Sequence, residues 1–467
     1  MKIKSRTLLL LASFSTTSYA TTFQPSGVSF RSPVTTAPGF SSDVLFSNLT
    51  TPRGITLDEQ ENILVVERGF GVTAFNPTTG GWERTVVITN PNFTQGIQLD
   101  GHLLYVSTAS DVLVYHYNSL NKSVSNDDSP NVLITGLPPD GDLTTHTLQL
   151  QKDGAETKLL IASGPFTNID PTARDPSSGR SQIRRFLLPQ SEPTVPLQWS
   201  AGEILAYGIR NPAGFAFHPS LSNQLYVVEN GPSIDNVTGL TPTFVNDNPA
   251  DELNLVAVGG NLKFYGFPDC APLWNPSADP IGDPQYVKLK RGDEISLLLE
   301  PERNDTWCMS PKNNVPPVLN FQAHSVPLDI KFYEAPTQPS ATSFPSSFNG
   351  DAVVSFHGSF DRVPPTGYGV VHVPFPLHGN YSFLVQATNL TTCPGTCIRP
   401  VGLAFSRSGV LYLALRDQKK LISDYRSCSQ ALNSDSDDAE LSLCGSEIPR
   451  TIATYVTNSA QLQVVFL

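Results

Sequence analysis

The chain has 467 residues, a formal net charge of -12, 33 Gly and 40 Pro. This length suits one large domain or two ordinary ones. The acidic balance argues against nucleic acid or an anionic membrane as a partner, because both attract a basic surface. The many turn-forming residues favour short strands over long helices, so the expected fold class is all-β.

The first 20 residues are typical of a secretory signal peptide. Lys2, Lys4 and Arg6 precede the apolar run Leu8–Leu11, and Ser18-Tyr19-Ala20 follows as a cleavage-site pattern. No other run approaches the ~18 apolar residues of a membrane span. We therefore expect a secreted, extracellular protein with no membrane span. Sequons that fit a glycosylated surface stand at Asn48, Asn92, Asn121, Asn236, Asn304, Asn380 and Asn389.

The 6 cysteines favour disulfides over a metal site, since the expected compartment is oxidising. Several connectivities are possible. Proximity in the sequence favours Cys270–Cys308, Cys393–Cys397 and Cys428–Cys444.

A strand–turn–strand pattern recurs six times along the chain. Each copy has an alternating first strand, a turn and a more apolar second strand, which predicts a β-hairpin. The copies are 53–57 with 63–67, 95–99 with 103–107, 146–150 with 159–163, 214–217 with 224–228, 327–332 with 352–356, and 400–405 with 411–415.

Repeated β units of irregular spacing predict a six-bladed β-propeller. Runs at 112–117, 183–186 and 368–373 would supply outer strands, and 232–252 and 269–316 would be long loops on one face. We expect a single propeller over residues 21–467, with its core at about 40–425 and an irregular C-terminal extension. The acidic, Ser-rich run 430–447 would be a mobile surface segment pinned by Cys444. The alternative is a pair of β-sandwiches.

If every hairpin starts and ends at one propeller face, its flanking residues gather around the axis. The residues before the first strands are Arg53, Gln95, His146, Arg210-Asn211, His324-Ser325 and Arg399. The residues after the second strands are Glu67-Arg68, Glu229-Asn230, His357 and Arg416, with Arg362 nearby. Clustered guanidinium groups suit a ligand with several carboxylates or phosphates. The alternative is that these arginines pin loops through salt bridges.

Several motifs stand in order along the chain. They are Tyr207–His218, Glu229–Pro232, Asp251–Asn254, Tyr265–Pro268, Ala323–Leu328, Phe356–Ser359 with Pro365–Tyr368, and Arg399–Phe405. Together these motifs resemble the soluble quinoprotein glucose/sorbosone dehydrogenase family, and are most similar to fungal pyrroloquinoline quinone (PQQ)-dependent pyranose dehydrogenases. The resemblance covers about residues 40–425.

This resemblance implies a six-bladed propeller that holds PQQ and Ca²⁺ at one mouth. It places the cofactor at Arg53, Gln95, Asn211, Asn230, His324, His357, Phe360, Arg362 and Arg399. Calcium would lie near the Gly231-Pro232 carbonyls, and Asp251-Glu252 would steady this loop or bind the ion. Arg210 would stabilise negative charge in the reaction, and His146 would be the base. Electrons would pass from a sugar to an external acceptor such as a cytochrome.

The chain departs from the family's pattern at three places. The family's His and following Arg correspond to Leu143 and His146, so a core or loop histidine is an open alternative for His146. The family's Asn-His-Gly reads Thr94-Gln95-Gly96. Its Gly-Ser-Trp-Asn-Arg reads 358–362, with Phe360 as the smaller aromatic.

Two other functions remain open from the sequence. One is a propeller without redox activity that binds a glycan or a protein partner at the same mouth. The other is a calcium-dependent lactonase or esterase. A serine hydrolase is disfavoured, because the sequence contains no Gly-x-Ser-x-Gly elbow.

Overall fold

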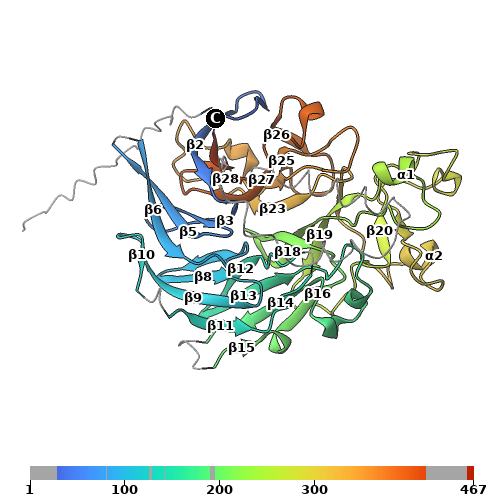
Figure 1. The fold of residues 1–467 in the computed structure, drawn as a ribbon, viewed down its shortest axis with the longest axis horizontal. Coiled ribbons are helices and arrows are strands. Elements are labelled where there is room, and N and C mark those ends of the chain that lie inside the picture. Colours follow the sequence, from blue (N-terminus) through green and yellow to red (C-terminus); the bar gives the residue numbers. More distant parts are fainter. Residues whose placement is uncertain are drawn as a thin grey trace, which may run out of the picture.

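The strands form twisted, mostly antiparallel sheets around a common centre (Figure 1). The computed structural model describes residues 29–79, 81–125, 129–141, 143–189 and 195–416, and the backbone of 460–466. The α-helices of these residues are short: α1 (Pro242–Asn246) and α2 (Asp305–Cys308). The remaining helical turns are the 3-10 segments Pro171–Arg174, Pro176–Ser178, Trp199–Ala201, Pro284–Tyr286, Ser346–Phe348 and Leu390–Thr392. The expected all-β propeller class is confirmed.

Within the described part of the chain, five sheets of four or more strands use only strands between Val34 and Ala387. One contains β3 (Pro52–Leu57), β4 (Ile63–Glu67), β5 (Gly71–Thr78) and β6 (Gly81–Thr89). The next contains β7 (Ile97–Asp100), β8 (Leu103–Ser107), β9 (Asp111–Asn118), β10 (Ser123–Val124), β11 (Asn131–Thr135) and β15 (Leu197–Gln198). The third contains β12 (Leu148–Asp153), β13 (Glu156–Ser163), β14 (Gln182–Leu187) and β16 (Glu203–Tyr207). The fourth contains β17 (Pro212–His218), β18 (Leu221–Glu229), β19 (Asp251–Ala257) and β22 (Leu319–Phe321). The fifth contains β23 (Pro327–Phe332), β24 (Ala352–Phe356), β25 (Gly369–Val373), β26 (Ser382–Ala387) and β1 (Val34–Thr36).

A further four-stranded sheet joins the two ends of the described chain. It contains β27 (Pro400–Phe405), β28 (Leu411–Leu415), β29 (Ala460–Phe466) and β2 (Ser41–Leu49). Strand β29 lies between β28 and β2 and pairs antiparallel with both. A short sheet of β20 (Cys270–Pro272) and β21 (Glu294–Ser296) stands apart from these.

All six predicted hairpins are confirmed as antiparallel pairs. They are β3–β4, β7–β8, β12–β13, β17–β18, β23–β24 and β27–β28. Each lies at one end of its sheet, and the expected strands at 112–117, 183–186 and 368–373 are the next strands outward. The second strands are apolar on both faces because they are covered on both sides: every residue of β4 and β24 is buried.

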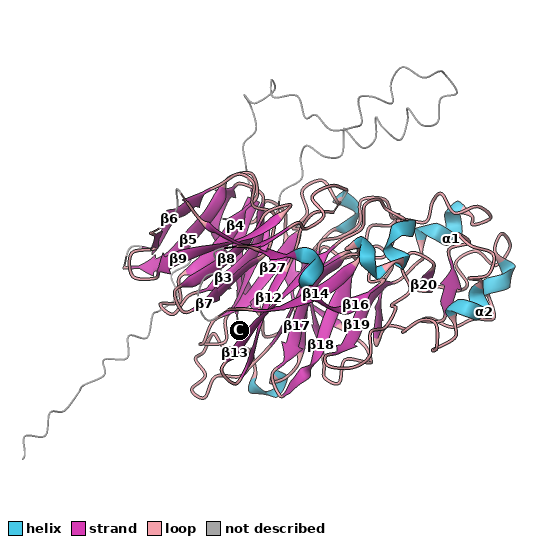
Figure 2. Cartoon of the chain, turned by 90° about the horizontal axis from the view of Figure 1, so that it is seen from below, coloured by secondary structure: helices cyan, strands magenta, loops and turns pink. Residues whose placement is uncertain are grey.

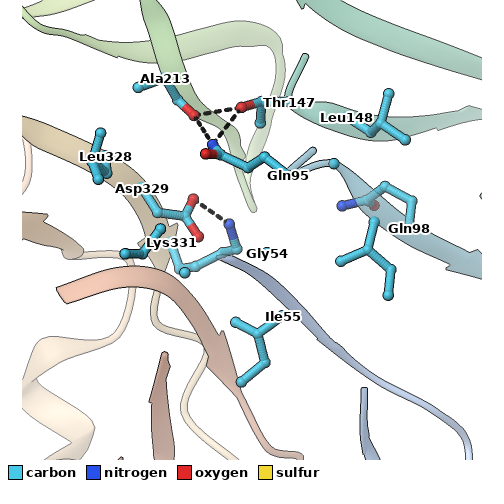
Figure 3. Close-up of a pocket in the computed structure, with 14 residues that line it drawn as sticks. Gly54, Ile55, Gln95, Gln98, Thr147, Leu148, Ala213, Leu328, Asp329 and Lys331 are labelled. Carbon is cyan, nitrogen blue, oxygen red and sulfur yellow. Dashed lines mark hydrogen bonds and ion pairs between the residues drawn. The ribbon is translucent and has the colours of Figure 1, made fainter. Parts of the chain in front are cut away.

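The first strands of the hairpins meet at the centre of the molecule. Glycines allow this close approach: a Cβ on Gly54, Gly96, Gly214 or Gly402 would lie 2.1–2.4 Å from the backbone of a neighbouring first strand or the segment leading into it. A cavity of about 30 Å³ remains among residues of all six first strands and the segments leading into them (Figure 3). It is large enough for about one water molecule. Because the centre is packed, we expect larger ligands to bind at the flanks of the hairpins.

The two segments expected as long loops contain structure of their own. They carry α1, β20, β21 and α2, which lie at one edge of the molecule (Figures 1 and 2). Ile234, Phe244 and Tyr286 belong to a separate apolar cluster there. The disulfide Cys270–Cys308 ties the segment together, and the buried Asp269 carboxylate pairs with Arg174 and Arg303. This cap segment, residues 232–250 and 269–316, forms one wall beside the hairpin flanks.

Two of the three expected disulfides, Cys270–Cys308 and Cys393–Cys397, are confirmed. Cys428, Cys444, the acidic run 430–447 and the leader 1–20 lie outside the described residues. All seven sequon asparagines are exposed. Among the described helices, none is long and apolar enough to cross a membrane.

Candidate functional site

Two buried arginines approach each other where β3 and β27 begin. Arg53 and Arg399 are only 7% and 2% exposed, and with Arg68 and Arg416 they form what we call the arginine group. Burial, together with the neighbouring charge of Arg416, lowers the pKa of Arg399 to about 10. Burial and the other three arginines lower the pKa of Arg53. The fold therefore holds two buried cations, Arg53 and Arg399, close to two further arginines.

Several guanidinium nitrogens in this region have no partner. Arg399 Nη2 donates to Gly358 O at 3.0 Å, but its Nε and Nη1 are buried without a hydrogen bond. Arg53 Nε is also buried and unpartnered. Buried donors without an acceptor are unfavourable by about 1–3 kcal/mol each, so these atoms are arranged for a group that they can bind.

The catalytic candidate Arg210 lies in a different environment, between β16 and β17, where its guanidinium is held by oxygen atoms. Its Nε and Nη2 donate to O and Oδ1 of Asn168 at 2.8 and 3.1 Å. Its Nη1 donates to the carbonyl oxygens of Asn230 and Gly231 at 3.1 and 3.3 Å. These contacts fix the direction of its charge. Asn211, which follows it, donates to Asn230 Oδ1 at 2.8 Å.

Beneath Arg210 lies a group of buried acids, the carboxylate group: Glu229, Asp251, Glu252 and Glu294. Burial raises the pKa of every member. The negative charge of the neighbouring Glu252 raises the pKa of Glu229 further.

Asp251 bonds to two backbone amides. Its Oδ1 accepts from Gly231 N at 2.8 Å and its Oδ2 accepts from Val326 N at 2.7 Å. Asp251 thereby ties the Gly231-Pro232 loop to the start of β23, so the prediction that it steadies this loop fits its contacts. Among the described residues, no group of three or more His, Cys, Asp or Glu side chains is placed to hold a metal ion.

Each of the three candidate histidines has a ring nitrogen close to a backbone carbonyl oxygen. His146 is 1% exposed, and both of its ring nitrogens face carbonyl oxygens: Nδ1 is 3.0 Å from Ala162 O and Nε2 is 2.8 Å from Ala109 O. His357 Nδ1 is 3.1 Å from Pro400 O, beside the arginine group. His324 Nδ1 is 3.5 Å from Asp361, and its Nε2 is 3.1 Å from Val245 O.

The remaining candidates are spread around the hairpin flanks. Gln95 Nε2 donates to Thr147 Oγ1 and Ala213 O at 2.9 and 3.0 Å, near the axis (Figure 3). Phe360 is 61% exposed. Arg362 forms an ion pair with Asp247 of the cap segment, and its Nε is buried without a partner.

Known proteins share this architecture. The TrAA12-like family model matches residues 34–422. The chain belongs to the TrAA12-like family.

A PQQ-dependent sugar dehydrogenase of Hypocrea jecorina is 31% identical over 414 residues, which cover 83% of this chain and 88% of that protein. A PQQ-dependent pyranose dehydrogenase of Coprinopsis cinerea is 30% identical over 413 residues. That alignment covers 81% of this TrAA12-like chain but 52% of the relative, so the chain spans about half the length of that protein. A calcium structure of the Trichoderma reesei Carbohydrate-Active Enzymes Family AA12 has a TM-score of 0.74 and 27% identity, and covers 94% of this chain and 98% of that one.

The residues of this TrAA12-like chain fit an anion with several carboxylates. Arg53 and Arg399 have unpartnered donors close to each other, and Arg362 has a further unpartnered donor. The sequence predicted these three arginines as one set, and the structure places the first two together and pairs the third with Asp247. The backbone oxygens at Gly231 and Pro232 are hard donors of the kind that calcium prefers, and their role as its ligands remains a prediction.

Sequence reasoning missed Asn168 and Asp361. Asn168 lies in a loop between β13 and β14 with no motif, and its bonds to Arg210 reach across 42 residues. Asp361 stands where the family's motif has Asn. Its partner His324 stands in a different hairpin flank, so the pair could not be inferred from spacing.

Proposed function

We propose that this chain is a secreted, PQQ- and Ca²⁺-dependent dehydrogenase of pyranose-type sugars that passes electrons to an external acceptor such as a cytochrome. The observation that carries the proposal is the arginine group, whose buried and unpartnered donors match a cofactor with three carboxylates. The names of the two sugar dehydrogenase relatives support the substrate class.

Arg53 and Arg399 would bind carboxylates of the cofactor through Nε and Nη1, and His357 would lie beside them. Asn211, Asn230 and Gln95 would add hydrogen bonds, and the exposed ring of Phe360 would stack on the quinone. His324 and Arg362 complete the set from the side of the cap segment. The bound cofactor supplies an electrophilic carbon that accepts hydride, with calcium at Gly231 and Pro232 acting as a Lewis acid.

Arg210 would stabilise the negative charge that develops in the reaction. Its four bonds to oxygen atoms hold the guanidinium in one orientation before substrate binds, which is the arrangement that electrostatic stabilisation requires. His146 stays the predicted base. Because both of its ring nitrogens face carbonyls, the ring must release one of these contacts to take a proton from a sugar hydroxyl.

Six blades and secretion are part of this proposal. The blade number is supported by six sheets of four or more strands in the described chain, the last of which depends on β29. Secretion and glycosylation are supported by the leader pattern, the two disulfides and the exposure of all seven sequon asparagines.

A calorimetric titration of the purified protein with PQQ, in calcium and again in chelator, tests the proposal. We expect one-to-one binding with a Kd below about 1 μM that weakens in chelator. Absence of binding in both buffers would overturn the cofactor assignment. Tight binding without turnover on any pyranose, with an artificial acceptor present, would leave a cofactor-binding propeller that is not a sugar dehydrogenase.

A further inference from the structure

A cavity of about 250 Å³ lies between the cap segment and the loop after β24. We call it the mouth cavity; its lining residues are Asp235, Leu240, Pro242, Val245, Asn246, His324 and Asp361. Pockets for drug-sized ligands measure about 300–1,000 Å³, so this one suits a ligand the size of one monosaccharide.

Both walls of the mouth cavity connect to the candidate site. Asp361 follows Phe360 and interacts electrostatically with Tyr368, whose ring lies 5.4 Å from the Arg399 guanidinium carbon. On the other wall, Asp235 Oδ2 accepts from Ser233 Oγ at 3.0 Å.

Ser233 in turn connects this wall to Arg210. Its N and O bond to the side chain of Asn168 at 2.9 and 2.6 Å, and Asn168 holds the Arg210 guanidinium. Hydrogen bonds through Ser233 and Asn168 therefore link Asp235, in this wall, to Arg210.

The walls are held together before any ligand binds. The Asn246 side chain donates to Val363 O and accepts from Val363 N, both at 2.8 Å. The ion pair between Asp247 and Arg362 lies beside this link. Such preorganisation reduces the entropy lost on binding.

The charges around the cavity favour a cation. Its lining has two carboxylates, Asp235 and Asp361, one histidine, His324, whose Nδ1 lies 3.5 Å from Asp361, and no Lys or Arg. The nearby Arg362 is paired with Asp247, so its charge does not offset the two carboxylates. The apolar side chains of Leu240, Pro242 and Val245 provide a surface for the C–H face of a sugar ring.

We propose that the mouth cavity binds an amino sugar, a monosaccharide that carries an ammonium group, in preference to neutral or acidic sugars. Asp361 binds the ammonium group, Asp235 on the opposite wall adds a second negative charge, and the apolar side chains contact the sugar ring. This inference rests on the proposed function, because it names the substrate class of the same site.

Binding to the cofactor-free protein tests the inference separately from the redox function. Glucosamine, glucose and glucuronate are titrated in chelator at low salt and about pH 6, below the pKa of about 8 of an α-amino group. We expect glucosamine to bind at least about tenfold more tightly than glucose, with glucuronate weakest. Raising the salt to about 0.5 M should reduce this preference, because ions screen partly exposed charges.

The variants Asp361→Asn and Asp235→Asn keep the shape of each side chain and remove its charge. Each should lower the ratio of glucosamine to glucose affinity by about fivefold. Asp153→Asn is the matched control, since its side chain is 71% exposed at the distant end of the β12–β13 hairpin. It should leave the ratio unchanged, and unfolding curves check that all three variants fold.

Equal affinity for glucosamine and glucose, no detectable glucosamine binding, or an equal effect of Asp153→Asn would overturn the inference. These outcomes are distinct from failure of the proposed function, since no quinone is present. If the protein binds PQQ but shows no preference for an amino sugar, the proposed cofactor site stands and the amino-sugar inference is wrong.

Discussion

Arg53 and Arg399 of the arginine group are buried, as are all four acids of the carboxylate group, but their hydrogen bonding is opposite. Among the described residues, the buried side-chain atoms without a partner include four guanidinium nitrogens of Arg53, Arg362 and Arg399, and no oxygen of any Asp or Glu. Asp251, by contrast, accepts from two backbone amides, and Glu229 accepts from Arg210 N at 2.5 Å and from Asn254 at 3.0 Å.

This difference distinguishes buried charges that stabilise the fold from buried charges that are available to bind a ligand. A buried charge whose bonds are all internal contributes to the fold, and its removal leaves its partners unsatisfied. A buried charge with vacant donors destabilises the empty protein and is explained by what it binds. The same kind of substitution should therefore have opposite consequences in the two groups.

The largest expected effect is on cofactor binding when Arg399 is replaced. Arg399→Ala removes two vacant donors, so the affinity for PQQ should fall at least about 100-fold, or about 2.7 kcal/mol. The empty variant should be as stable as the wild type or more stable, because a desolvated cation beside Arg53 and Arg416 is lost. Titration calorimetry and denaturant unfolding measure the two quantities.

Arg184→Ala is the matched control for Arg399→Ala. Arg184 is also buried, but its guanidinium donates to Gln182 Oε1, Trp199 O and Pro176 O. This variant should be less stable and should bind PQQ as the wild type does. If Arg399→Ala proved the more destabilised of the two and kept its affinity, the contrast between vacant and satisfied charges would be wrong.

In the carboxylate group the effect should be on stability. Asp251→Ala leaves the amides of Gly231 and Val326 without their acceptors, so the free energy of unfolding should fall by about 2–5 kcal/mol. Denaturant midpoints at constant m-value provide the measurement. The exposed Asp153→Ala should change stability by no more than about 0.5 kcal/mol. A loss of that small size for Asp251→Ala would show that the loop does not depend on this carboxylate.

The sequence predicts contacts between neighbouring residues well and contacts between residues far apart in the chain poorly. The hairpins follow from alternation and turn residues within about 20 neighbouring positions, and all but the longest have short connections. The approach of Arg53 to Arg399 follows from their shared place before first strands. The pairing of Arg362 with Asp247, 115 residues away, and the carbonyl contacts of His146 depend on how separate segments pack, which no local pattern encodes.

The smallest expected effect is the pH dependence contributed by His357. Burial lowers its pKa well below the ordinary value of 6.5, and Arg399, Arg416 and Arg53 lower it further. A base with a lowered pKa binds fewer protons in the folded state, so its contribution to stability is complete above about pH 6.5 and is lost as the pH falls toward the folded pKa. The slope is at most about 1.4 kcal/mol per pH unit for one proton.

His357→Gln should therefore reduce the acid-side slope of the unfolding free energy, measured by denaturant titrations between about pH 4 and pH 7. His146→Gln should reduce it less. Burial lowers the pKa of His146 too, but bonds to the carbonyls of Ala162 and Ala109 act in the opposite direction, whereas arginines surround His357. Equal slopes in the two variants would mean that burial alone governs both histidines, and that the charge of the arginine group does not reach His357.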